Sequence, residues 1–341
     1  MIKRTYQVVL EAVTPIAHHA ETLGNHQMLQ RRKVRNRSGR FVEVPYITGD
    51  TMRHGLRESA AYSALDAAGL QAGNLSAAAL NLLFAGGAIT GASGPSVSIS
   101  NYREMVDVFP PLALLGGCAG NRCIPGKLTV GNADLICAEN AHLLPAWAVE
   151  AAGGHVCEID GECCIRAEGL PGQRQHVEIM QRVRMDPSLN PDKRQLLSVD
   201  ARTAIEGRLL ANEDASANGD AVGVEDSKSS MMPRTFEALA AGALFFWEAT
   251  AITHSDLELD TWHVMLGAFL RDCGVGGKRS TGFGRLRPVS GWTRGFDWRS
   301  PATGGEAVDP NAIGGRAGDV FRAHMSERTD RLRAFLDGVI A

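Results

Sequence analysis

The segment Gly274–Leu286 constrains this chain most strongly, because it places five glycines, two adjacent cations and two hydroxyl side chains within thirteen residues. Glycine accepts positive φ and has no Cβ, so backbone N–H groups can turn towards one point and a ligand can approach the backbone closely. Lys278 and Arg279 add positive charge, and Ser280 and Thr281 add hydroxyl donors. The segment therefore predicts a loop that binds an anion, and phosphate fits it best.

Two familiar phosphate motifs are excluded by residues in and around this segment. A P-loop would need Gly at Asp272 and Ser or Thr at Arg279. A dinucleotide fingerprint, Gly-x-Gly-x-x-Gly, ends on Arg279 or on Arg287 instead of Gly. Gly282-Phe283-Gly284 resembles the centre of the RNA motif of RRM domains, but Arg285 and Arg287 stand where apolar and stacking residues belong. The segment therefore predicts no nucleotide-cofactor site.

The distribution of charge points to contact with phosphate although the net charge does not. The chain has 341 residues, 44% of them hydrophobic, and a formal net charge of −3, which is typical of a soluble globular protein of one or two domains. Within it, residues 31–40 carry six cations and no acid, and residues 274–299 carry six cations against the single Asp297. Acids collect elsewhere, in 213–226. Local basic surface on a nearly neutral body is what a phosphate-binding protein requires.

Cysteines and hydropathy predict a cytoplasmic protein without a metal site. The N-terminus does not have the pattern of a signal peptide, and no apolar run approaches membrane-spanning length. Seven cysteines is an odd number, which favours reduced thiols. The nearest candidates for zinc ligands are Cys118-x4-Cys123 and Cys157-x5-Cys163, with His142 and His155. Structural zinc sites usually have closer ligand pairs, so we expect neither a metal nor a cofactor.

The first part of the chain predicts a strand, a basic connection and a helix. A buried strand is expected at 5–13. The polar, basic stretch that follows predicts a functional loop or hairpin, with a solvated flexible arm as the alternative. A strand at 41–47 then leads into a helix at 50–68, with Asp50 as its N-cap. Arg53 and Arg57 repel each other across one turn by roughly a few tenths of a kcal/mol, which a bound anion would reverse; two solvated arginines are the simpler alternative.

The rest of the chain predicts further strands around a polar insertion. Residues 186–232 form the polar insertion, which we expect to be an exposed protrusion. Strands are expected at 128–136, 155–167, 176–185 and 283–289, a buried strand or strand pair at 235–253, and helices at 76–84, 261–273 and 319–340. The order strand, helix, strands, helix, strand predicts an α+β fold, specifically an elaborated ferredoxin-like (RRM-like) core. Gly274 follows a helix, so the helix dipole there would repel an anion and the loop itself must supply the affinity.

Catalytic patterns are nearly absent from the sequence. No Gly-x-Ser-x-Gly or His-Glu-x-x-His motif occurs. His18 and His19 could act as an acid–base pair for RNA cleavage, although a pair of histidines after a proline turn is more often structural.

Taken together, these motifs resemble the RAMP superfamily of CRISPR proteins, and more narrowly the backbone subunit that coats the guide RNA in multisubunit effector complexes. The matching pieces are Thr14-Pro15-Ile16, the run Val44–Arg53 leading into Leu56-Arg57, Gly126–Val130, Ala241–Phe245 and the glycine segment 274–286. Their order and spacing cover much of 5–136 and 235–290. The long acidic insertion is most similar to the type IV branch.

The resemblance implies a palm, fingers and thumb. The RRM-like palm would comprise 1–50, 121–185 and 233–290. Helical fingers would be inserted at 51–120, a hairpin thumb at 186–232, and a C-terminal linker and helix would follow at 291–341. In the thumb, Met231 and Met232 are candidates for displacing a base, although paired methionines are more often core filler.

The resemblance also implies which residues grip the guide phosphates. They are Thr51, Arg53 and Arg57 at the helix start, Lys278, Arg279, Ser280 and Thr281 in the glycine loop, and Arg31, Arg32, Lys33, Arg35 and Arg37 in the basic stretch. Asp50 departs from the hydroxyl residue common in the family and places an acid near these phosphates.

The function that follows is a non-catalytic RNA-binding subunit that oligomerises along CRISPR guide RNA and leaves the bases free to pair with a target. Its partners would be guide RNA, further copies of itself, other effector subunits and, through the guide, target nucleic acid. Type III relatives cut RNA with an Asp after the first strand, whereas this chain has no Asp before Asp50. We therefore expect no nuclease activity. A guide-processing endoribonuclease and a phosphate- or nucleotide-binding enzyme are the alternatives.

Overall fold

The computed structural model describes residues 1–70, 75–87, 99–119, 122–159, 162–166, 168–182, 192, 195–207, 234–298 and 305–338. The chain forms two compact units. The first contains 1–20, 29–178 and 238–341, and the second contains 21–28 and 179–237. Met231 and Met232, and most of the expected thumb at 186–232, lie outside the described residues.

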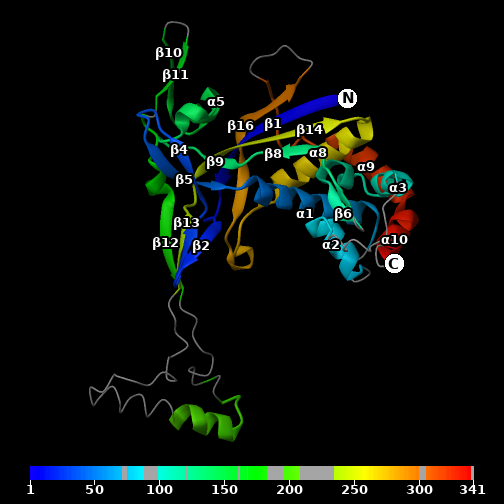
Figure 1. The fold of residues 1–341 in the computed structure, drawn as a ribbon, viewed down its shortest axis with the longest axis horizontal. Coiled ribbons are helices and arrows are strands. Elements are labelled where there is room, and N and C mark those ends of the chain that lie inside the picture. Colours follow the sequence, from blue (N-terminus) through cyan, green and yellow to red (C-terminus); the bar gives the residue numbers. More distant parts are fainter. Residues whose placement is uncertain are drawn as a thin grey trace. The chain divides into compact units, whose positions relative to one another are not determined.

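The first unit is built on a large β-sheet (Figure 1). Its neighbouring strands, in order across the sheet, are β15, β16, β1, β14, β9, β5 and β4. β8 pairs with β14 and β17 pairs with β16 at the side of this path. The strands are β1 (Ile2–Ala12), β4 (Arg31–Arg35), β5 (Phe41–Ile47), β8 (Leu128–Val130), β9 (Ala133–Leu135), β14 (Leu244–Thr253), β15 (Cys273–Gly274), β16 (Arg285–Asp297) and β17 (Glu306–Ala307). The pairs that β1 forms with β14 and β16 are antiparallel.

The alternation of side chains along the central strands creates two buried faces. Val8 and Leu10 of β1 belong to the main core, whereas Val9 belongs to a separate cluster on the other face. β14 alternates in the same way, with Phe245 and Trp247 fully buried in the main core. Successive residues of a strand point to opposite sides, so a sheet that is apolar on both faces needs cover on both.

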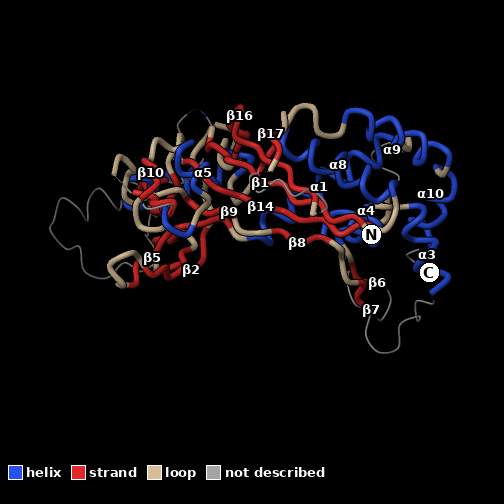
Figure 2. The backbone as a smooth tube through the Cα atoms, turned by 90° about the horizontal axis from the view of Figure 1, so that it is seen from above, coloured by secondary structure: helices blue, strands red, loops and turns tan. Residues whose placement is uncertain are grey.

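Helices cover the face that carries the main core. α1 (Gly49–Ala67) and α8 (Asp256–Arg271) pack there, and the Trp247 and Phe269 rings meet edge-on with centroids 5.5 Å apart. A second apolar cluster joins α1 to α2 (Ala77–Ala85), α3 (Ile99–Val108), α4 (Pro111–Leu115), α9 (Gly315–Glu327) and α10 (Thr329–Gly338). In Figure 2, helices α9 and α10 lie at one end of this unit and β5 and β10 at the other, with β9, β14 and α8 between them. None of the helices in the described ranges is long and apolar enough to cross a membrane.

The opposite face is covered by a smaller layer. α5 (Ala146–Ala151), which follows a short turn at Ala141–Leu143, packs against Val9, Phe246 and Trp292. The Trp147 and Trp292 rings stack with centroids 6.5 Å apart. Two hairpins complete the unit, β6 (Gly117–Ala119) with β7 (Arg122–Ile124) and β10 (His155–Ile159) with β11 (Glu162–Arg166).

The second unit contains most of a four-stranded sheet in the order β12, β13, β3, β2. These strands are β2 (His19–Leu23), β3 (His26–Leu29), β12 (Val177–Arg182) and β13 (Arg234–Leu239). β3 and β13 pair in parallel, and His26 Nδ1 lies 2.8 Å from Thr235 Oγ1 across that pair. Residues 199–207 are helical.

The predicted α+β class is confirmed, with several differences in detail. Of the two alternatives for 235–253, the structure has the strand pair, although β14 pairs with β1 rather than with β13. The expected C-terminal helix is two helices, α9 and α10. Cys118 and Cys123, expected to be reduced, form a disulfide across the β6–β7 hairpin. The basic stretch is not a flexible arm, because it supplies β2, β3 and β4.

Candidate nucleic-acid interface

The glycine loop is fastened to the residues that follow β1. The Gly277 amide donates to the Ala17 carbonyl at 2.8 Å, and the Gly284 amide donates to the Pro15 carbonyl at 2.9 Å. Gly276 has φ 72°, and a Cβ there would lie 2.7 Å from the Ala17 oxygen. Glycine is therefore required at this position both by the backbone conformation and by the closeness of the neighbouring chain.

Several of the loop amides form hydrogen bonds within the fold. Those of Val275, Thr281 and Gly282 donate to the carbonyls of Gly284, Lys278 and Arg279, at 2.7, 2.9 and 3.0 Å. Together with the two contacts to the Pro15–Ala17 segment, these bonds differ from the expected cradle of amides turned towards an anion. These amides are therefore not turned towards an anion, and the side chains of the loop add the charge.

The side chains of the loop are held in different ways. Lys278 has φ 61° and is the only non-glycine residue with positive φ in the part of the chain that the structure describes. Such a conformation costs on the order of 1 kcal/mol, which the surrounding structure must offset. Arg279 Nη1 lies 2.6 Å from Glu58 Oε2 of α1. Ser280 is exposed, and the exposed Thr281 donates its hydroxyl to the Lys278 carbonyl at 2.9 Å.

The start of α1 lies beside a polar cavity of about 330 Å³. It is lined by Tyr46, Thr48, Gly49, Asp50, Arg53, Val130 and Asn132. Thr48 is the N-cap of α1, in place of the expected Asp50, because its side chain accepts from the Thr51 amide. The Gly49 amide donates to Asn132 Oδ1 at 2.8 Å. Asp50 lines the cavity and opposes the binding of an anion there.

Arg53 and Arg57 hold backbone carbonyls in the folded chain. Arg53 donates to the carbonyls of Leu128, at 3.2 Å, and Leu115. Arg57 Nη2 donates to the carbonyls of Leu115 and Gly116 at 3.2 and 3.0 Å, and only 9% of Arg57 is exposed. Burial and then the charge of Arg53 lower the pKa of Arg57 to about 10. Phosphate contact by Arg57 stays a prediction, and it would require these bonds to open.

The strands β4 and β5 form a hairpin with a strongly basic surface. Lys33, Arg35, Arg37 and Arg40 are exposed. Arg32 points to the other side, where it pairs with Asp134 at 2.9 Å and lies 5.6 Å from the centre of the Tyr46 ring. Arg31 is half-buried and interacts with another group of the chain.

Phe41 is the residue of this hairpin that the charge pattern did not reveal. It is 72% exposed and lies directly opposite Arg35. An exposed aromatic ring among cations is a feature of surfaces that bind single-stranded nucleic acid. The alternation of the 41–47 strand could have indicated an outward position, but only the register shows which residues share its face.

His18 ties the segment after β1 to the start of α1. Its Nε2 accepts from the Thr48 amide at 3.3 Å, and burial followed by the charge of His19 lowers its pKa. Both effects favour the neutral ring, so His18 positions the helix start. His19 is also engaged by a neighbouring group.

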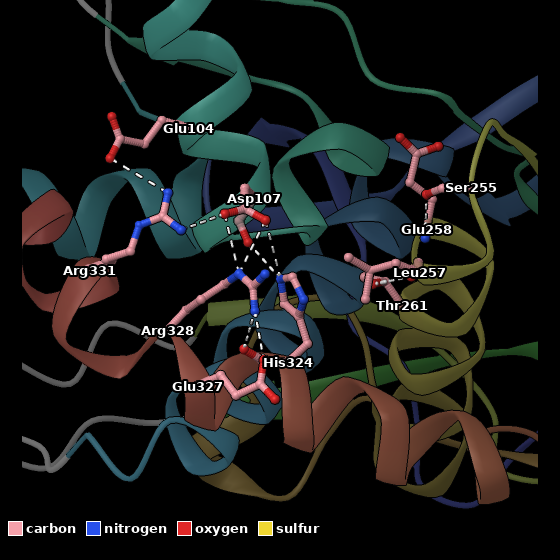
Figure 3. Close-up of polar contacts among 10 residues, drawn as sticks. All are labelled: Glu104, Asp107, Ser255, Leu257, Glu258, Thr261, His324, Glu327, Arg328 and Arg331. Carbon is pink, nitrogen blue, oxygen red and sulfur yellow. Dashed lines mark hydrogen bonds and ion pairs between the residues drawn. The ribbon is translucent and has the colours of Figure 1, made fainter.

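The polar clusters outside this region bind the fold together. Asp107 of α3 accepts from Arg328 at 3.1 Å and from Arg331 at 2.8 Å, while His324 Nε2 lies 2.7 Å from the Asp107 carbonyl (Figure 3). Burial raises the pKa of Asp107, but the hydrogen bonds from both arginines outweigh it and lower that pKa overall. The cluster joins α3 to α9 and α10. Among the described residues, no group of three or more His, Cys, Asp or Glu side chains is placed to hold a metal ion.

A further cavity of about 450 Å³ lies between α8 and the start of α9. Tyr6 Oη lies 3.0 Å from His263 Nε2 at its wall. Burial, and then the charge of Arg4, lower the pKa of His263 to about 4. Asp260 and Arg316 stand on the rim. The Tyr6–His263 pair is therefore neutral near pH 7 and joins β1 to α8.

Comparison with known proteins places the fold. No family model and no curated protein matches the chain. The structure is similar to that of a chain in a solved structure described as a "Type IV-B CRISPR Complex". The two chains are 15% identical, the match covers 91% of this chain and 97% of the other, and the TM-score is 0.50. At this identity the likeness concerns the fold, so the chain shares its fold with a chain of that complex.

Proposed function

We propose that this chain is a non-catalytic, RNA-binding backbone subunit of a CRISPR effector complex, of the RAMP superfamily and its type IV branch. The observation that carries the proposal is the fold match over nearly the whole length of both chains. The motifs at Thr14-Pro15-Ile16, Val44–Arg53 and 274–286, found from the sequence alone, point to the same family.

The strand order supports an elaborated ferredoxin-like palm. The chain passes through β1, α1, the short strands β8 and β9, β14, α8 and β16, which is the strand–helix–strand–strand–helix–strand order of that core. In the sheet, β16 lies beside β1, β1 beside β14, and β14 beside β8 and β9. In the proposal, residues 51–120, which contain most of α1 and all of α2, α3 and α4, are the fingers, and the insertion 186–232 is the thumb.

The basic side chains give the proposed mode of binding. Lys278 and Arg279 in the glycine loop and the exposed cations of the β4–β5 hairpin contact phosphates, with Ser280 and Thr281 as hydroxyl donors. Contacts of this kind carry no sequence information, so binding is largely independent of sequence and sensitive to salt. The bases remain free to pair with a target. Further copies of the chain and other effector subunits complete the assembly.

Purification followed by incubation with RNA tests the proposal. The preparation should carry RNA, seen in the ratio of absorbance at 260 and 280 nm, and should form large oligomers that leave labelled repeat RNA intact. Lys278→Ala combined with Arg279→Ala should weaken binding. Specific cleavage that is lost in His18→Ala or His19→Ala would instead establish the endoribonuclease. A monomer that is free of RNA and binds a nucleotide would establish a phosphate-binding enzyme.

A further inference from the structure

The outward face of the β4–β5 hairpin combines cations with one aromatic ring. In the antiparallel register, Arg31 faces Pro45, Lys33 faces Glu43 and Arg35 faces Phe41. Residues directly opposite one another share a face, so these three pairs lie on one side of the hairpin. That side is buried at Pro45 and exposed at Lys33, Glu43, Arg35 and Phe41. The alternate pairs, Arg32 with Val44 and Val34 with Val42, lie on the other face, where Val34 and Val44 are buried. We call the first surface the hairpin face.

Hydrogen bonds close the turn at the tip of the hairpin. The Asn36 amide donates to the Arg40 carbonyl, and the Arg40 amide donates to Asn36 Oδ1, each at 2.9 Å. The Ser38 hydroxyl donates to the same Oδ1 at 2.8 Å. Arg35 Nε reaches the Gly39 carbonyl at 3.4 Å. Arg37 and Arg40 therefore project from an ordered turn beside Phe41.

Phe41 lies outside the hydrophobic core formed by the described residues. Its side chain is 72% exposed, whereas Val34 and Val44 on the other side of the same hairpin are 4% and 1% exposed. The neighbouring turn adds Leu143, which is 57% exposed, and His142 Nε2 lies 3.1 Å from the Arg35 carbonyl. The hairpin face thus presents an apolar spot bordered by cations.

The positive charge around this apolar spot favours a negatively charged ligand. Residues 31–40 contain no acid, and Glu43 is the only acid on the paired hairpin face. Among the residues that the structure describes, Lys33, Arg37 and Arg40 enter no ion pair. A ligand that fits must therefore carry repeated negative charge and also offer a flat apolar surface. Single-stranded nucleic acid has both, because its phosphates meet the cations and an unpaired base can stack on the ring.

We propose that Phe41 is a stacking platform for an unpaired base of single-stranded RNA held on the hairpin face. This inference rests on the proposed RNA-binding function and adds to it a contact that depends on bases rather than on charge. It makes the hairpin face selective for single strands, because the bases of a duplex are stacked on one another and cannot reach the ring.

A comparison of base-bearing RNA with abasic RNA of the same length tests this contact. Phe41→Ala should weaken the binding of base-bearing single-stranded RNA by about 5- to 150-fold and leave abasic RNA unaffected. The salt dependence should not change, because phenylalanine neutralises no phosphate. Phe41→Trp should retain the affinity, and its additional fluorescence should be quenched by base-bearing RNA and not by abasic RNA. Trp298→Ala removes another aromatic side chain, 57% exposed, and is the matched control.

The outcomes separate the two proposals. If the wild-type chain binds single-stranded RNA and Phe41→Ala binds it equally well, stacking is refuted while the RNA-binding function stands. If Phe41→Ala weakens abasic RNA to the same extent, Phe41 acts through the shape of the hairpin and the stacking role is again refuted. A wild-type chain that binds no RNA overturns both proposals.

Discussion

Removing two cations from the hairpin face should flatten the salt dependence of RNA binding by a calculable amount. Lys33 and Arg35 are exposed on the hairpin face and belong to the same strand. Neither enters an ion pair with another described residue, so both charges can meet phosphate. The variant Lys33→Ala with Arg35→Ala deletes both charges and leaves the buried side of the hairpin intact.

The size of the effect follows from counterion release. Each phosphate contact on a single strand contributes about −0.7 to the slope of log K against log salt, so the loss of two contacts reduces the slope by about 1.4. At about 0.1 M salt this corresponds to roughly 25-fold weaker binding. The difference should vanish as the salt concentration approaches about 1 M.

Fluorescence anisotropy of a labelled single-stranded RNA, measured between about 50 and 200 mM salt, gives the slope directly. The matched control is Arg322→Ala with Arg333→Ala on α9 and α10, which removes the same charge from residues that pair with Asp319 and Asp330. A slope that stays unchanged in the hairpin variant would refute phosphate contact by this surface. If the salt slope changes equally in both variants, the effect comes from the net charge of the protein and not from contacts of the hairpin face.

Three further predictions follow from individual contacts. Glu58→Gln should strengthen RNA binding severalfold in the same assay, because it releases Arg279 from an ion pair of 2.6 Å; unchanged affinity would show that Arg279 does not meet RNA. Gly276→Ala should lower the free energy of unfolding in denaturant by about 1–3 kcal/mol more than Gly282→Ala. Both positions have positive φ, but only at Gly276 would a Cβ meet a backbone carbonyl, at 2.7 Å, so equal losses would contradict the reasoning. Burial lowers the pKa of His263 from 6.5 to about 4. Between these two pH values the His263 imidazole is therefore neutral in the folded chain and protonated in the unfolded chain. The free energy of unfolding should therefore fall between about pH 6.5 and pH 4, by up to about 3 kcal/mol, and His263→Gln should remove that part of the pH dependence measured by denaturant unfolding.

The first strand and the long helix that follows the basic stretch were predictable because their patterns are strong. The apolar run at 5–13 has one dominant physical explanation, a buried strand. The helix expected at 261–273 instead ends at Arg271, with Asp272 as its C-cap, and Gly274 belongs to β15. The helix at 50–68 was placed correctly within a residue at each end, yet its cap was not Asp50. Thr48 and Asp50 are both good caps by propensity. In the structure Thr48 accepts from the Thr51 amide, and the Gly49 amide is bound by Asn132, which lies far away in the sequence.

The site was harder to predict because burial is a tertiary property. The spacing of Arg53 and Arg57 predicted that both lie on a helix surface. The carbonyls of Leu115 and Gly116 that accept hydrogen bonds from Arg57 come from a different part of the chain, so the spacing could not reveal them. Composition identified the hairpin as basic. Only the register of β4 with β5 brought Phe41 opposite Arg35.

Sedimentation of the purified chain with intact single-stranded RNAs of increasing length tests the central claim most directly. A backbone subunit that tracks phosphates should bind in a number of copies that rises with RNA length, with the RNA recovered uncut. A fixed number of copies whatever the RNA length, or no binding at low salt, would contradict it.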